Sequence, residues 1–227
     1  MKFRWLGQAG LLFDNGKCRV MIDPYLSDSV GRLDPSRARR VPICEALFET
    51  LPDVMIFTHD HLDHFDPETA ERFLTQSKKR MTVLSPRSVF PKARAFGGGH
   101  NYVEFDRHTE WTEDTLRFRA VRAAHSDHDA IGVVIEELTT GKVYYITGDT
   151  LYNREIFADL PPRIDVIFLP INGVGNNMNV TDATRFAKDC GAHAVVPYHV
   201  GMLDTLTPDC YPEKNRILPK LYEEIEV

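Results

Sequence analysis

Short apolar runs separated by glycine, asparagine and aspartate dominate the start of the chain. They occupy residues 3–6, 10–13 and 18–22, and Asp14-Asn15-Gly16 is placed as a hairpin turn between the last two. Runs of this length and spacing are typical of β-strands joined by tight turns. The pattern therefore predicts an N-terminal β-meander.

The rest of the chain alternates between strand-like and helix-like patterns. Residues 54–58 form an apolar run too short for a helix, and its abrupt end at His59 indicates a buried strand with polar chemistry at its carboxyl end. Asp66 and Pro67 are placed as the N-cap and first-turn proline of a helix. A polar loop is expected over 27–40, and apolar residues recur at helix-like spacing after residue 212. Further strands are expected over 82–84, 101–104, 116–123, 131–137, 143–147, 166–169 and 194–197, and helices over 43–51, 67–74, 89–96, 153–160 and 181–190.

A β-rich part of the chain is followed by a part that contains helices, and this order occurs twice. It predicts an α+β fold in which two mixed β-sheets pack face to face with helices on their outer faces, an αββα sandwich. A length of 227 residues is about one and a half typical domains, and folds of this size usually form one. We therefore expect residues 1–227 to form a single domain.

Composition and charge narrow the class of function. Apolar residues make up 43% of the chain and charged residues 26%, which is typical of a folded globular protein. The net charge of -6 argues against a nucleic-acid or anionic-membrane partner and favours a small-molecule substrate. The four cysteines form no C-x-x-C pair, and neither a leader-like apolar region nor a membrane-spanning run stands out. We expect reduced thiols and a cytoplasmic location. The sequence leaves open whether the chain forms a homo-oligomer.

The densest group of potential metal ligands is His59-Asp60-His61-Leu62-Asp63-His64, directly after the predicted buried strand. Side chains two apart in an extended segment share a face, so His59 and His61 can hold one metal ion. A turn at Leu62 would direct Asp63 and His64 to a second ion. Zn²⁺ and Mn²⁺ both accept imidazole and carboxylate ligands. The competing interpretation is a polar strand end with solvated or capping histidines.

Three isolated residues repeat this arrangement of a strand followed by a ligand. His125, Asp149 and His199 each come directly after an apolar strand-like run. Taken singly, each of them is a weak indication of a metal site. Asp149, for example, could simply cap the next helix. Together with the first group they complete seven ligands, enough for two divalent ions per chain that share one carboxylate.

This set of residues resembles the metal-binding motifs of the metallo-β-lactamase superfamily. Those motifs are an H-x-H-x-D-H segment, a later histidine, a bridging aspartate and a final histidine, and the resemblance covers essentially the whole chain. The chain looks most like the branch of the L-ascorbate-6-phosphate lactonase, through Thr147-Gly148-Asp149-Thr150, Leu169-Pro170-Ile171-Asn172-Gly173, Asn177-Met178-Asn179 and Pro197-Tyr198-His199. The chain is compact beside that lactonase, so substrate-binding insertions are expected to be absent.

The resemblance implies the metallo-β-lactamase sandwich and a division of the ligands. His59, His61 and His125 would hold one ion, Asp63, His64 and His199 the other, and Asp149 would bridge them. It further implies that a metal-bridging hydroxide opens a lactone, for instance a sugar-acid phosphate lactone such as L-ascorbate 6-phosphate, while Asp63 or Asp149 moves the proton. A metal-dependent phosphodiesterase of the same superfamily is the alternative enzyme. A metal-bound sensor is the non-enzymatic alternative.

Several weaker residues have both a functional and a structural interpretation. Asp23 could orient a ligand imidazole or form a turn before Pro24. An arginine-rich loop could receive a substrate phosphate or simply be solvated. The arginines of that loop are Arg37, Arg39 and Arg40. The remaining candidates could line the cleft or serve in turns and helix caps; they are His128, Asn172, Asn177 and Asn179.

Overall fold

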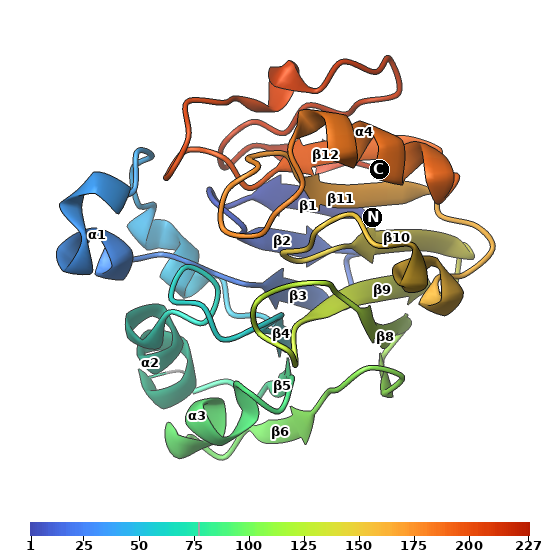
Figure 1. The fold of residues 1–227 in the computed structure, drawn as a ribbon. Helices are drawn as coiled ribbons and strands as arrows, with labels where there is room; N and C mark the ends of the chain where they lie inside the picture. The colour runs from blue at the N-terminus through green and yellow to red at the C-terminus, as the bar shows by residue number, and fades with distance from the viewer. Residues whose placement is uncertain (77) are drawn as a thin grey trace.

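The computed structural model describes residues 1–76 and 78–227, and two β-sheets form its centre (Figure 1). The first sheet contains, in spatial order, β13 (Glu224–Glu226), β1 (Lys2–Trp5), β2 (Leu11–Asp14), β3 (Arg19–Ile22), β4 (Val54–Ile56), β5 (Thr82–Ser85) and β6 (Asn101–Glu104). The second contains β12 (Ala194–Tyr198), β11 (Val166–Pro170), β10 (Lys142–Ile146), β9 (Ile131–Glu137), β8 (Leu116–Arg122) and β7 (Glu110–Glu113).

The sheets pack against each other through one apolar core. Phe168 of β11 packs edge-on against Phe3 of β1 and Phe13 of β2, with ring centroids 5.0 and 5.1 Å apart. Helices cover the outer faces. α2 (Pro67–Gln76) and α3 (Phe90–Ala95) contribute to a second apolar cluster against the first sheet, and α4 (Val180–Asp189) packs on the second sheet through Phe186. The predicted α+β αββα sandwich is therefore confirmed.

Strand direction explains where functional side chains can gather. β1 and β3 both run antiparallel to β2, and β3 and β4 are parallel, so the carboxyl ends of β1, β3 and β4 lie at one edge of the first sheet. In the second sheet β8 and β10 both run antiparallel to β9, while β10, β11 and β12 are parallel. The carboxyl ends of these four strands also share an edge. Residues that directly follow these strands can therefore meet.

Some predicted elements are different in the structure. The helices expected over 43–51 and 153–160 are short 3₁₀ segments, Glu45–Glu49 and Arg154–Asp159. The tail after residue 212 is not helical, because Pro219 interrupts it and its end pairs with β1 as β13. The pattern also did not predict β7 or the short helix α1 (Ser29–Leu33). Within the described residues, none of the helices is long and apolar enough to cross a membrane.

Candidate metal centre

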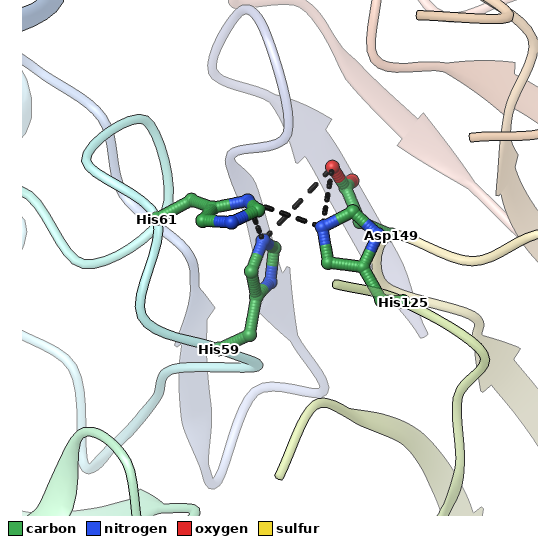
Figure 2. A group of neighbouring side chains, drawn as sticks. All are labelled: His59, His61, His125 and Asp149. Atoms are coloured by element: carbon green, nitrogen blue, oxygen red, sulfur yellow. Dashed lines mark hydrogen bonds and ion pairs between the residues drawn. The ribbon is translucent and has the colours of Figure 1, made fainter. Parts of the chain in front are cut away.

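Seven histidine and aspartate side chains converge where the carboxyl ends of the strands meet. They come from the segment after β4, from the loop after β8 and from the residues that follow β10 and β12. Figure 2 shows His59 and His61 reaching from one segment toward His125 and Asp149. The set consists of His59, His61, Asp63, His64, His125, Asp149 and His199.

The first of two groups contains three histidines and one carboxylate. His61 Nδ1 lies 3.0 Å from His59 Nε2 and 3.1 Å from His125 Nε2. Asp149 Oδ2 lies 4.0 Å from His59 Nε2 and 3.9 Å from His125 Nε2. One ligand atom from each of these four side chains lies within 4.8 Å of every other. This spacing allows one ion to touch all four.

The second group lies against the other oxygen of the same carboxylate. His64 Nε2 and His199 Nε2 are 3.1 Å apart, and Asp63 Oδ2 is 3.8 Å from each of them. Asp149 Oδ1 is 3.3 Å from His64 Nε2 and 2.9 Å from His199 Nε2. The two oxygens of Asp149 therefore face different groups of histidines.

The donor atoms fit divalent cations. Neighbouring imidazole nitrogens face one another at 3.0 to 3.1 Å, an arrangement that brings lone pairs together unless a proton or a cation lies between them. Asp149 Oδ1 is buried, and it faces the imidazole nitrogens of His64 and His199. Imidazole nitrogen with carboxylate oxygen is a donor set that Zn²⁺ and Mn²⁺ accept.

Two of the buried groups have charge states that suit ligands, whereas at His64 and His199 the nearby Asp149 carboxylate outweighs burial and raises the pKa. Burial lowers the pKa of His59 well below its usual value, and neighbouring His64 lowers it further, so its imidazole is neutral. Burial raises the pKa of Asp149, but His199 and His64 outweigh this effect and hold that pKa well below the usual value, so the carboxylate is ionised. A neutral imidazole and an ionised carboxylate are the forms that bind metal.

Asp23, one of the weaker sequence candidates, lies behind His64. Its Oδ2 is 2.8 Å from His64 Nδ1 and accepts a hydrogen bond from Thr58 Oγ1 at 2.5 Å, while its Oδ1 accepts from the Thr58 backbone N–H at 2.8 Å. Asp23 lies close enough to His59 and His64 to form a third group of potential ligands. Because its oxygens are already engaged, we assign it to orienting the His64 ring so that Nε2 faces the site.

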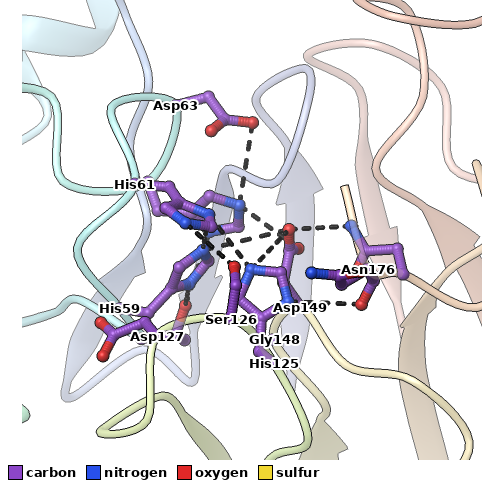
Figure 3. A network of polar contacts seen from close by, with 12 residues as sticks. His59, His61, Asp63, His125, Ser126, Asp127, Gly148, Asp149 and Asn176 are labelled. Atoms are coloured by element: carbon purple, nitrogen blue, oxygen red, sulfur yellow. Dashed lines mark hydrogen bonds and ion pairs between the residues drawn. The ribbon is translucent and has the colours of Figure 1, made fainter. Parts of the chain in front are cut away.

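Asparagine side chains support two other members of the set. Asn177 donates from Nδ2 to Asp149 Oδ2 at 2.8 Å, and its Oδ1 accepts from the Thr150 backbone N–H at 3.0 Å. Asn172 Nδ2 is 3.0 Å from His199 Nδ1. Figure 3 shows Asn176 beside Asp149 and His125, and its backbone oxygen lies 3.3 Å from His125 Nδ1.

Gln8 is a supporting residue that the sequence pattern did not reveal. It follows β1, is 2% exposed, and donates from Nε2 to Asp63 Oδ2 at 3.2 Å while lying 3.4 Å from His199 Nδ1. Its backbone φ is 50°, and Asp23, Asn176 and His199 also have positive φ. Such conformations cost about 1–3 kcal/mol each in non-glycine residues, so their concentration here marks a backbone shaped by the site.

The structure gives two other sequence candidates different roles. Asn179 Oδ1 accepts from the Asp182 backbone N–H at 2.9 Å and caps α4, so the side chain is engaged as a helix cap and not as a cleft residue. His128 lines a depression with Asp106 and Asp129 that also includes the potential ligand His125, and it does not line the cleft that contains His61, Asp63, Asp149 and His199. His128 therefore stays a candidate beside His125, while Asn179 is a helix cap.

Two of the three arginines considered for a substrate phosphate are engaged with backbone carbonyls. Arg39 donates from Nη2 to the Leu6 carbonyl at 2.7 Å and from Nε to the Val41 carbonyl at 3.1 Å, and it also contacts the Tyr25 carbonyl. Arg40 Nη1 donates to the Asp204 carbonyl at 2.5 Å. These guanidinium groups hold the loop in place instead of facing a ligand.

Comparisons with known proteins show the family to which the chain belongs. Residues 18–200 match the protein family described as the beta-lactamase superfamily domain. The chain is 26% identical over 245 residues to a UPF0173 metal-dependent hydrolase of Thermoplasma volcanium, with 100% of this chain and 99% of that protein covered.

Solved structures show the same fold. Igni18, a novel metallo hydrolase from the archaeon Ignicoccus hospitalis, superposes with a TM-score of 0.77 at 19% identity, covering 99% of this chain and 97% of that one. An isothiocyanate hydrolase from Delia radicum gut bacteria gives a TM-score of 0.75 at 20% identity, covering 100% and 99%.

Proposed function

The chain belongs to the metallo-β-lactamase superfamily of metal-dependent hydrolases, and from that premise we propose that it uses two divalent ions to open a lactone. The observation that carries the proposal is the division of Asp149, whose Oδ2 faces His59 and His125 while Oδ1 faces His64 and His199. A carboxylate placed in this way can bridge two ions. Zn²⁺ and Mn²⁺ are the ions we propose.

The bound ions would supply the chemistry that no side chain here supplies alone. Paired divalent ions lower the pKa of water from 15.7 to about 7 and polarise a scissile carbonyl. This shift is worth on the order of 12 kcal/mol at 1.36 kcal/mol per unit, so no serine or cysteine nucleophile is required.

The side chains then divide the remaining tasks. Asp149 is buried, ionised and held by Asn177, which suits a fixed ligand. Asp63 borders the cleft, and its side chain is 16% exposed. In lactone opening the ring C–O bond breaks, the carbonyl carbon gains a water oxygen, and the ring oxygen needs a proton. We assign that proton transfer to Asp63, because its side chain is more exposed than that of Asp149, which also borders the cleft but is 6% exposed.

A phosphorylated sugar lactone has less support than a neutral one. Arg39 and Arg40 are engaged with backbone carbonyls, and Arg37, which does border the cleft, is 3.1 Å from Asp34 through its Nε. The described cleft residues therefore include a single guanidinium, and a carboxylate already neutralises it. A phosphodiester substrate would meet the same neutralised guanidinium, so it too has less support than a neutral lactone.

Turnover of a substrate panel tests this proposal. Protein reconstituted with Mn²⁺ or Zn²⁺ is expected to hydrolyse a neutral lactone with a kcat/KM at least about tenfold above that for a phosphorylated lactone, a generic phosphodiester or an alkyl isothiocyanate, a difference of about 1.4 kcal/mol in transition-state stabilisation. Preference for the phosphodiester would favour the alternative enzyme. Absence of any turnover with both ions bound would favour a sensor.

A further inference from the structure

Part of the lining of the cleft at the potential metal ligands is apolar. The cleft has a volume of about 360 Å³, and its lining includes His61, Asp63, Asp149 and His199. A volume of this size falls in the range of small-molecule sites. The apolar part of the lining, which we call the apolar wall, consists of Val30 and Leu33 from α1, Leu62, Val174, and Met202 and Leu203.

Two exposed apolar side chains belong to this wall. Leu33 is 80% exposed and Val174 is 36% exposed, and both border the cleft. The other large hydrophobic residues that are similarly exposed in the described chain are Leu138, Leu151 and Leu218, which lie outside the cleft lining. An exposed leucine at the mouth of a cleft is covered when an apolar ligand binds.

The apolar wall is held in place by the arginine loop. The Arg40 backbone N–H donates to the Gly201 carbonyl at 3.1 Å, which ties the segment after α1 to the segment that carries Met202 and Leu203. Arg39 also donates to Tyr222 Oη at 3.1 Å. These contacts fix the two segments relative to each other, so little ordering is needed when a ligand binds.

We propose that the substrate is a neutral lactone with an aliphatic chain, which lies on the apolar wall while the ring lies at the metal ligands. This inference rests on the proposed function and specifies its substrate. The wall adjoins His61, Asp63 and Asp149 in one cleft, so a single small molecule can contact both parts. Arg37 and Asp34, which also line the cleft, balance each other, so among the described lining residues no arginine or lysine offers an unpaired charge to an anionic group.

A binding experiment tests the inference without turnover. γ-Lactams, which resemble lactones but resist hydrolysis, are titrated onto the metal-loaded protein and followed by NMR or calorimetry. The series carries no alkyl chain, a propyl chain or a hexyl chain. We expect the Kd to fall about two- to fourfold per added methylene, since full burial of one methylene contributes about 0.8 kcal/mol.

Leu33→Ser is the decisive variant, because the residue is exposed and the change should leave the fold and metal content intact. It is expected to weaken binding of the hexyl lactam about tenfold and to leave the unsubstituted lactam unchanged. Leu138→Ser, at a leucine that is 46% exposed but outside the cleft lining, is the matched control and should have no effect.

Two outcomes would overturn the inference. One is a Kd that does not depend on chain length. The other is tighter binding of a phosphorylated lactam that Arg37→Ala abolishes. Either result can occur while lactones are still hydrolysed, and chain-dependent binding can occur without hydrolysis. The two proposals therefore fail separately.

Discussion

Replacing Asp149 by alanine is expected to lower kcat by about a thousandfold or more and to leave the purified protein depleted of both metal ions. Each oxygen of Asp149 faces a different histidine group, at 2.9 Å from His199 Nε2 on one side and 3.9 Å from His125 Nε2 on the other. Removing the carboxylate takes one negative ligand from both groups. Because every substrate depends on this ligand, kcat/KM should fall together with kcat.

Steady-state kinetics with elemental analysis of the same samples measures both effects. Asp149→Asn keeps the shape and loses the charge, so it should retain more metal than the alanine variant and still lose activity. Asp60→Ala is the matched control, since Asp60 lies in the same histidine-rich motif but pairs with Lys92 at the surface. An Asp149→Ala protein with two tightly held ions and near-native turnover would overturn the bridging assignment.

Arg39→Ala is expected to lower the free energy of unfolding by about 3 kcal/mol. The guanidinium donates to the carbonyls of Leu6, Tyr25 and Val41 and to Tyr222 Oη, joining the segment after β1 to the loop that follows α1. Its loss leaves partly buried carbonyls without partners, which costs more than the removal of a surface charge.

Chemical denaturation measures this change. Arg37→Ala is the control within the same loop, because its exposed ion pair with Asp34 should contribute no more than about 0.5 kcal/mol. A loss below about 1 kcal/mol for Arg39→Ala would contradict a structural role. It would return Arg39 to the set of candidate substrate contacts.

The positions of the potential ligands could be predicted because they depend on short-range pattern. An apolar run that stops at a histidine or aspartate marks the end of a buried strand, and parallel strands end at a common edge. His59, His125, Asp149 and His199 all follow strands of this kind. The strand pattern alone therefore places these side chains near one another.

Contacts that depend on loop geometry could not be predicted in this way. Gln8 reaches Asp63 across 55 positions of sequence, through a backbone with positive φ. The arginine side chains of the 27–40 loop could equally face solvent, a phosphate or carbonyl groups, and only the folded loop decides. The 3₁₀ segment Arg154–Asp159 is similar, because Asn153 caps it and Pro161 follows closely, leaving too few residues for a stable α-helix.

The number of ions bound per chain tests the central claim most directly. Protein saturated with Mn²⁺ or Zn²⁺, freed of excess metal and examined by elemental analysis and native mass spectrometry, is expected to hold two ions per chain. The reason is that His59, His61 and His125 lie on one side of Asp149, and Asp63, His64 and His199 on the other. One ion or fewer per chain under saturation with either metal would contradict the two-ion site and the mechanism that depends on it.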